Sequence, residues 1–278
     1  MVTRLRPARP DDQTRLADLI RLGTHLHRHL DWRPPLEWLG APEYWLLERD
    51  QVLTAALACP PDPASVAWLR LFVHDQRVSL RESWLSLWSA ARQALSAPLT
   101  VAAIALEPWL GEILQESQFQ LSERVVFLEY DNFAARRDVP PPGITLRPMN
   151  FQDLPAVAAL DAAAFAPLWR NSLASLQRAF RLAGIASLAL RGEEIVGYQI
   201  STRGAASVHL ARLAVSPVAQ RSGVGAALVR DLFAQAQRFD LYQVTVNTQA
   251  SNLHSLALYQ KLGFERTGES YPVYTYQI

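Results

Sequence analysis

Residues 210–226, LARLAVSPVAQRSGVGA, restrict the fold most, because they join a buried strand to a helix through a turn with two glycines. The apolar run Leu210–Val215 is typical of a buried strand, and Pro217, which has no backbone N–H, ends its hydrogen-bond ladder. A helical sequence follows over Ala226–Gln237. Glycines let backbone N–H groups approach a ligand, and N–H groups that open a helix are unsatisfied and lie at its positive end. The pattern predicts an anion site suited to a pyrophosphate.

The position of this turn argues against two other phosphate-binding classes. A dinucleotide-binding turn belongs to the first βα unit, with several strands still to follow. Here the sequence after Asp240 has room for little more than a strand, a helix and a terminal ribbon. A Walker-type loop is excluded because no Lys-Ser or Lys-Thr follows the glycines. A glycine-capped helix without a ligand is the alternative that the pattern leaves open.

An internal repeat divides the chain into two halves. Leu5-Arg6-Pro7 recurs as Leu146-Arg147-Pro148, and the strand at residues 68–73 recurs at 210–215. The Pro-rich stretch between the copies predicts domains at 1–138 and 144–278, joined by a linker at 139–143. The first copy has VSLRES at residues 78–83, where the second has QRSGVG. We therefore expect the anion site in the second copy alone.

A second motif in the second copy, NLHSLALYQKLGF at 252–264, makes the interpretation specific. A strand with L-A-V-x-P, the loop Q/R-x-x-G-x-G/A and this segment together resemble the GNAT (Gcn5-related) N-acetyltransferase family. The resemblance covers residues 144–278 directly and residues 1–142 through the repeat. It implies an α/β (α+β) fold of two tandem GNAT-like domains. Each would be a mixed, mostly antiparallel sheet with a splayed central pair of parallel strands, flanked by helices.

The resemblance implies that acetyl-CoA binds to the second copy and that the first is degenerate. In this family the pantetheine arm lies in the gap beside the splayed strand, and the pyrophosphate lies on the glycine loop. Carried over to this sequence, the cofactor-binding residues are Leu213, Ala214, Val215, Arg221, Ser222, Gly223, Val224, Gly225, Ala226, Asn252 and Ser255.

The resemblance gives Tyr259 the role of general acid for the departing thiolate. Asn252, Ser255 and Tyr259 fall on one face of the predicted helix. A phenol, with a pKa of about 10, can hand a proton to a thiolate whose conjugate acid has a pKa of about 8.5. A tyrosine that only packs its ring in the core is the alternative.

The general base is where the sequence departs from the family pattern. No carboxylate lies between Ile195 and Arg230, and Asn247 stands where some relatives have a glutamate. We predict His209 as the base, since its intrinsic pKa is suitable. Glu194, Asp161 or a water relay are the alternatives.

The predicted reaction is direct attack of an acceptor amine on the acetyl thioester. The acceptor would be a small-molecule or amino-acid-like amine, in a surface formed by Phe165, Trp169, Tyr198 and the ribbon with Tyr271 and Tyr274. The missing base leaves a second interpretation, a non-catalytic acyl-CoA sensor or partner-interaction module.

Composition and charge exclude several other classes. The apolar share of 50% and the charged share of 19% are typical of a globular protein. No apolar run reaches the roughly 18 residues of a membrane span, the N-terminal sequence lacks signal-peptide features, and the single Cys59 fits a reducing compartment, so we expect a cytoplasmic protein. Residues 143–278 have 12 Arg and Lys against 8 Asp and Glu, but no basic stripe of a nucleic-acid binder. We predict no metal, with His25, His27 and His29 at a solvated helix end, and a homodimer as one option.

Overall fold

The computed structural model describes residues 2–131 and 139–278, which form two compact units. Unit 1 contains the chain up to Ser122 together with Tyr271–Ile278, and unit 2 contains Glu123–Ser270. The end of the first predicted domain, residues 132–138, lies outside the described residues. Within the described ranges no helix is long and apolar enough to cross a bilayer.

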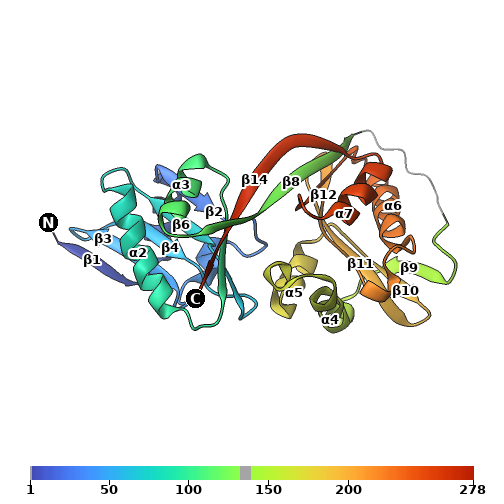
Figure 1. Cartoon of the computed structure of the whole chain (residues 1–278), viewed down its shortest axis with the longest axis horizontal. Helices are drawn as coiled ribbons and strands as arrows, with labels where there is room; N and C mark the ends of the chain where they lie inside the picture. The colour runs from blue at the N-terminus through green and yellow to red at the C-terminus, as the bar shows by residue number, and fades with distance from the viewer. Residues whose placement is uncertain (1, 132–138) are drawn as a thin grey trace. The chain divides into compact units, whose positions relative to one another are not determined.

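Unit 1 has a five-stranded sheet in the order β1-β3-β4-β6-β2, whose strands are labelled in Figure 1. In a second group of strands, β7 pairs with β5 and with the end of β14. Its core contains Trp84 and Trp88, which face Phe72 and Phe119. Its elements are β1 (Thr3–Pro7), α1 (Gln13–Leu22), β2 (His25–Arg28), β3 (Tyr44–Arg49), β4 (Val52–Ala58), β5 (Val66–Trp68), β6 (Leu71–His74), α2 (Leu80–Ala94), β7 (Thr100–Ile104), α3 (Pro108–Glu116) and the start of β8 (Gln120–Asp131).

Unit 2 has the strand order β8-β13-β12-β11-β10-β9. The central pair β12 and β13 is parallel and the other pairs are antiparallel, which confirms the predicted mixed sheet. Its elements are β9 (Ile144–Pro148), α4 (Leu154–Ala164), α5 (Leu173–Leu182), β10 (Ile185–Arg191), β11 (Glu194–Arg203), β12 (Ser207–Val215), α6 (Val224–Gln237), β13 (Gln243–Gln249), α7 (Leu253–Lys261) and the start of β14 (Glu265–Gln277).

Helices cover both faces of the unit 2 sheet, with α4 and α5 on one side and α6 and α7 on the other (Figure 1). Successive residues of a strand point to opposite faces. Accordingly, on β11 the Tyr198 hydroxyl bonds Asp161 of α4, whereas a Cβ on Gly197 would lie 3.0 Å from Val224 of α6. The glycine at this position allows α6, and the loop that opens it, to lie close to the sheet.

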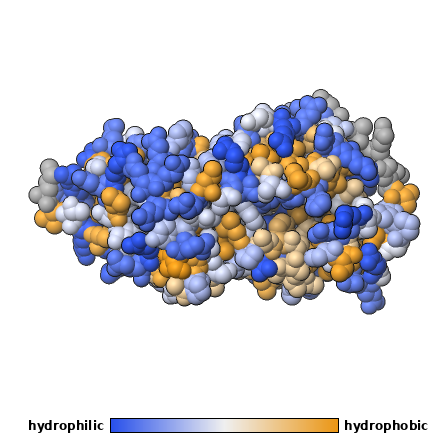
Figure 2. Space-filling model, viewed as in Figure 1, coloured by the Kyte–Doolittle hydropathy of each residue, from blue (hydrophilic) through white to orange (hydrophobic). Residues whose placement is uncertain are grey.

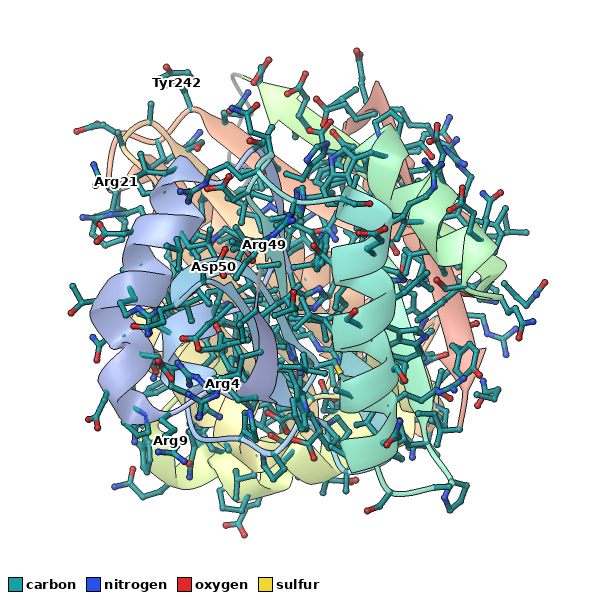
Figure 3. All side chains as sticks on the ribbon, turned by 90° about the vertical axis from the view of Figure 1, so that its left-hand side faces the viewer. Arg4, Arg9, Arg21, Arg49, Asp50 and Tyr242 are labelled. Carbon is teal, nitrogen blue, oxygen red and sulfur yellow. The ribbon has the colours of Figure 1, made fainter. Side chains whose placement is uncertain are left out.

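The repeat seen in the sequence is also present in the structure. Arg6 donates to both carboxylate oxygens of Asp12 at 2.7 and 2.6 Å, and Arg147 does the same to Asp153 at 2.7 and 2.8 Å. Each aspartate also accepts the backbone N–H three residues before it, which fixes the start of α1 and of α4. In unit 1 this pair lies in a charged hollow of about 560 Å³, which Arg4 and Arg9 also line (Figure 3).

The first copy differs from its expected structure at the histidine segment. His25–Arg28 is the strand β2, antiparallel to β6, so the predicted solvated helix end is wrong. His27 is 3% exposed, and its Nε2 lies 2.9 Å from the Leu69 carbonyl oxygen. Pairing with a distant strand decides this local structure, and a local sequence pattern does not encode it.

The compact units do not follow the predicted domain boundaries. β8 pairs with β13 over Val125–Asp131, within unit 2. β14 begins in unit 2 at Glu265 and pairs with β7 of unit 1 over Val273–Gln277. Residues 139–143 contain no helix or strand.

Candidate functional site

The central parallel strands of unit 2 separate part way along their length. β12 pairs with β13 from Ser207 to Leu210. Beyond Leu210, the residues Leu213, Ala214 and Val215 pair with β11 on their other side. No described residue of β13 pairs with these three, so their outer edge presents backbone N–H and C=O groups that a strand-like ligand can pair with.

The glycine loop continues directly from this edge and opens α6. Gly223 is the N-cap, with φ +87°, and Arg221 has φ +60°, so the loop uses left-handed backbone twice. The first intrahelical bond runs from the Ala227 N–H to the Gly223 carbonyl. The N–H groups of Val224, Gly225 and Ala226 therefore have no acceptor within the helix and form an anion site at its positive end.

A cavity of about 600 Å³ joins the strand edge, the loop and α7. It is lined by nine of the eleven predicted cofactor-binding residues, namely Leu213, Ala214, Val215, Arg221, Gly223, Gly225, Ala226, Asn252 and Ser255. The side chains of the other two point elsewhere: the Ser222 hydroxyl donates to the Ala219 carbonyl at 2.6 Å, and Val224 is buried. A Cβ on Gly225 would lie 3.2 Å from Leu258, so the glycine leaves room at the cavity wall.

The start of α7 supplies the opposite wall. Asn252 caps the helix, because its Oδ1 accepts the Ser255 N–H at 3.2 Å. His254, Leu258 and Lys261 also line the cavity and were not predicted. Their spacing of four and three residues places them on one helical face, and this spacing was the signal available in the sequence.

Among the residues that the structure describes, the cavity wall carries the cations Arg221 and Lys261 and the imidazole of His254, and it carries no Asp or Glu. Lys261 is the sole lysine of the chain. This arrangement complements a polyphosphate. In Figure 2 hydrophobic surface is visible over α4, α5 and α7 of this unit.

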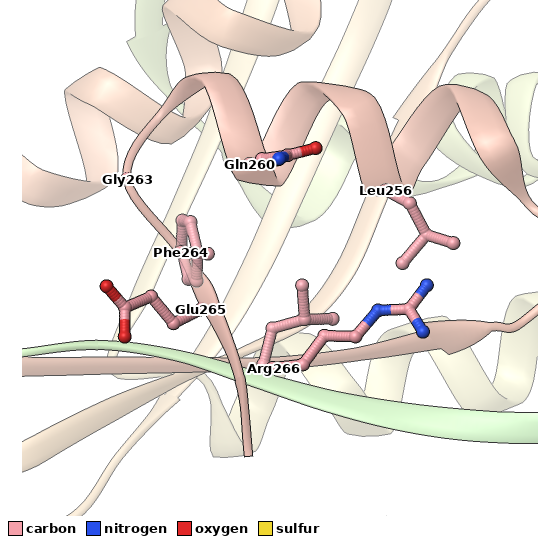
Figure 4. Close-up of a pocket in the computed structure, with 7 residues that line it drawn as sticks. Leu256, Gln260, Gly263, Phe264, Glu265 and Arg266 are labelled. Carbon is pink, nitrogen blue, oxygen red and sulfur yellow. The ribbon is translucent and has the colours of Figure 1, made fainter. Parts of the chain in front are cut away.

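A second cavity, of about 480 Å³, lies on another side of α7 (Figure 4). Leu256 and Gln260 line it from α7, and Phe264 and Arg266 from the segment that follows. None of the predicted site residues lines it. The first cavity is therefore the candidate functional site, because the predicted cofactor-binding residues line it.

Tyr259 is not among the residues that line the first cavity. It is 4% exposed and its ring lies 5.4 Å from that of Phe264. Burial raises the pKa of its hydroxyl, so the phenol stays protonated and can donate a proton. Its role as general acid stays a prediction.

None of the residues considered as a base lines the cavity either. His209 lies on β12 with Nδ1 2.9 Å from the Thr245 hydroxyl, and burial lowers its pKa. Asp161 is fully buried and paired with Arg212, and Glu194 is exposed at the start of β11. The identity of the general base therefore stays a prediction.

The expected acceptor surface is present only in part. Phe165 lines the cavity and Trp169 is half-buried nearby in the α4–α5 connection. Tyr198 is fully buried. Tyr274 is buried in the core of unit 1, where its hydroxyl accepts from Gln115, so neither of these two tyrosines can line an acceptor surface.

In unit 1 the strand that corresponds to β12 is β6, and the edge that matches Leu213–Val215 is occupied by the strand β2. β6 pairs with β4 on one side and with β2 on the other, with His25–Arg28 opposite Leu71–His74. A strand of the chain itself lies where unit 2 has a free edge. The first copy also lacks the glycines, and its strand β6 has a partner on both sides over Leu71–His74.

The acetyltransferase (GNAT) family matches residues 154–264, which include the whole cavity. Over 69 residues the chain is 39% identical to N-acetyltransferase family 8 member 3 of Mus musculus, covering 25% of this chain and 30% of that protein. Over 74 residues it is 32% identical to the uncharacterized N-acetyltransferase YvbK of Bacillus subtilis, covering 26% of this chain and 48% of that protein. The matches thus span less than half the length of these curated relatives.

Two solved structures share the fold along nearly the whole chain. A tandem GNAT protein from the clavulanic acid biosynthesis pathway superposes with a TM-score of 0.69 at 18% identity, covering 99% of this chain and 98% of that one. A GCN5-related N-acetyltransferase from Sphaerobacter thermophilus gives 0.66 at 17%, covering 99% and 95%. Residues 154–264 thus match the acetyltransferase (GNAT) family, and the fold of the chain is that of these two solved structures.

Proposed function

We propose that the chain is an N-acetyltransferase that takes its acetyl group from acetyl-CoA and transfers it to a small-molecule or amino-acid-like amine. The observation that carries the proposal is the cavity of unit 2, which collects residues of β12, the glycine loop and α7 on one surface. Strand edge, anion site and cationic wall each match one part of a CoA thioester.

The residues of the cavity fit this group. The backbone of Leu213 and Val215 would pair with the amides of the pantetheine arm. The N–H groups from Arg221 to Ala226 would hold the pyrophosphate, and hydrogen bonds to a charged acceptor contribute about 1.5–3 kcal/mol each. Lys261 would add a charge-assisted contact to a phosphate.

Transfer of the acetyl group requires the protein to assist three steps. The amine must lose a proton, and we assign this step to a water relay, with His209 as the residue it would reach. Its lowered pKa keeps His209 neutral at pH 7 and able to accept a proton. The carbonyl must be polarised, for which the backbone N–H near Val215 is suited. The leaving thiolate must gain a proton, and Tyr259 is the donor we propose.

Calorimetry with acetyl-CoA tests the proposal. Gly223→Glu should abolish micromolar binding, because it adds a carboxylate and a strained φ of +87° at the anion site. Gly192→Glu is the matched control, since Gly192 also has a positive φ, +62°, in the β10–β11 turn, with open space around it. Equal loss in both variants, or no binding by the wild type, would contradict the proposal.

A non-catalytic acyl-CoA sensor is the second candidate, and one observation favours it. No carboxylate within residues 2–131 and 139–278 lines the cavity, and none of the residues considered as a base does. A sensor would bind acetyl-CoA with the same dependence on Gly223 but release no CoA thiol with any amine. Cytoplasmic location and a homodimer stay predictions.

A further inference from the structure

Arg212 lies at the centre of a buried network beside the cavity. Its Nε donates to Asp161 Oδ2 at 2.8 Å, and its Nη2 donates to the Trp169 carbonyl at 2.7 Å. Asp161 also accepts the Tyr198 hydroxyl at 2.5 Å and the Asn171 N–H at 2.9 Å. The network therefore ties the α4–α5 connection to β11 and β12.

Phe165 covers the guanidinium of Arg212 and also lines the cavity. The Arg212 Cζ lies 3.5 Å from the centre of the phenyl ring. The Phe165 carbonyl accepts from Arg170 Nε at 3.0 Å, which holds the backbone of the same residue. The ring thus lies between the partly exposed guanidinium of Arg212 and the cavity.

The cation on one face of the Phe165 ring affects which groups the ring can bind from the cavity. A cation over one face of a phenyl ring draws on its negative quadrupole, so the ring attracts a second cation less. In the part of the chain that the structure describes, no Asp or Glu lines the cavity to pair with an additional ammonium group. An apolar or aromatic body, in contrast, gains from burial against the ring.

We propose that Phe165, held by Arg212 and Asp161, determines acceptor specificity by receiving the apolar body of a monoamine and by disfavouring polyamines. The inference rests on the proposed function, because it assumes that acetyl-CoA fills the rest of the cavity. Arg212 and Asp161 act as positioning residues, and Phe165 is the residue that touches the acceptor.

Binding of two probe amines to the protein saturated with CoA tests the proposal without turnover. 2-Phenylethylamine carries one ammonium group and a ring, whereas cadaverine carries two ammonium groups on an alkyl chain. We expect the first to bind at least tenfold more tightly in calorimetry. Thiol release from acetyl-CoA should show the same order in kcat/KM.

Variants assign the preference to the network. Phe165→Ala should raise the KM for 2-phenylethylamine more than tenfold and leave the Kd for acetyl-CoA within twofold, whereas Phe165→Tyr should retain the preference. Arg212→Met should raise the same KM, since the ring loses its support. Arg203→Met is the control, because Arg203 lies 4.7 Å over Phe239 and does not line the cavity.

The outcomes separate this proposal from the one it rests on. If CoA does not bind, the proposed function fails and this inference with it. If CoA binds but the two amines bind equally, or neither binds, the specificity proposal is overturned and the CoA site stands. The same holds if Phe165→Ala and Arg203→Met behave alike. Thermal melts of each variant identify a folding defect, and a folded Phe165→Tyr without the preference also overturns the proposal.

Discussion

Asp161 and His209 are both candidates for the general base from the sequence, and the structure places them in different surroundings. Asp161 accepts hydrogen bonds from Arg212, Tyr198 and Asn171, and a fully buried carboxylate so paired is not available to an amine. His209 is turned toward Thr245, and burial lowers its pKa. Residue type and position in the chain suggest these candidates, but side-chain partners decide which can act.

Tyr259→Phe tests the general acid. We expect kcat to fall by about 10²–10⁴-fold, which is typical for the loss of a positioned proton donor. The Kd for acetyl-CoA should stay within twofold, and the melting temperature should change little, because the ring that packs on Phe264 is retained. Steady-state kinetics and calorimetry measure both. Unchanged kcat would make Tyr259 a core residue only.

Lys261→Ala tests the cationic wall. Loss of one partly screened contact to a phosphate should weaken acetyl-CoA binding by about fivefold, or roughly 1 kcal/mol, and should reduce its dependence on salt. Calorimetry at two ionic strengths checks this. Arg266→Ala is the control, since Arg266 lines the second cavity, shown in Figure 4. A similar effect from both would indicate a general charge effect.

Elements with a strong local signal were predictable from the sequence, and elements defined by distant pairing were not. The helix at Leu173–Leu182 and the hairpin of β10 and β11 follow from periodicity and turn residues. β2 was misjudged because His25–Arg28 becomes a strand only by pairing with β6. In the candidate site, the glycine loop and the start of α7 were predicted, because glycines and helix-capping residues are recognised from neighbouring residues in the sequence. The cavity contacts of Lys261 and the pairing of Asp161 depend on tertiary packing.

The strand β2 predicts how unit 1 responds to acid. Burial lowers the pKa of His27 to about 4, and burial together with Arg70 lowers that of His29. The folded unit therefore binds fewer protons than the unfolded chain, whose histidines titrate near pH 6.5. The stabilisation is complete above pH 6.5 and is lost as the pH falls toward 4. For His27 alone the loss is roughly 3 kcal/mol.

Urea unfolding of the chain between pH 4 and 7.5 measures this dependence. His27→Gln cannot titrate in this range and should flatten the dependence below pH 6.5, whereas His254→Gln, at an exposed position, should leave it as in the wild type. If the free energy of unfolding depended on pH equally in the wild type and in His27→Gln, His27 would not be the source of the acid sensitivity.

At the scale of the whole molecule, the order of residues along the chain does not match the division into compact units. β8 comes from the first half of the sequence and pairs with β13, while β14 comes from the second half and ends on β7. The repeat in the sequence marks two copies correctly, but it carries no information about which copy each final strand joins.

Two fragments test whether β8 belongs to unit 2 and the end of β14 to unit 1. Residues 123–270 keep β8 beside β13 and omit the end of β14, so this fragment should be soluble and should bind acetyl-CoA. Residues 144–278 lack β8 and expose Tyr274, which is buried in the full chain, so they should aggregate. Size-exclusion chromatography and calorimetry compare the two. A well-behaved 144–278 fragment with full affinity would contradict the assignment.

The exchanged final strands have a consequence for how such a gene can change. After a duplication, a copy that loses its ligand is ordinarily free to be trimmed away. Here a deletion of the first copy would remove β8 from beside β13, and truncation of the last residues would remove a strand from beside β7. A shortening of either half at these strands would therefore disturb the sheet of the other half, whereas substitutions that keep the pairing would not.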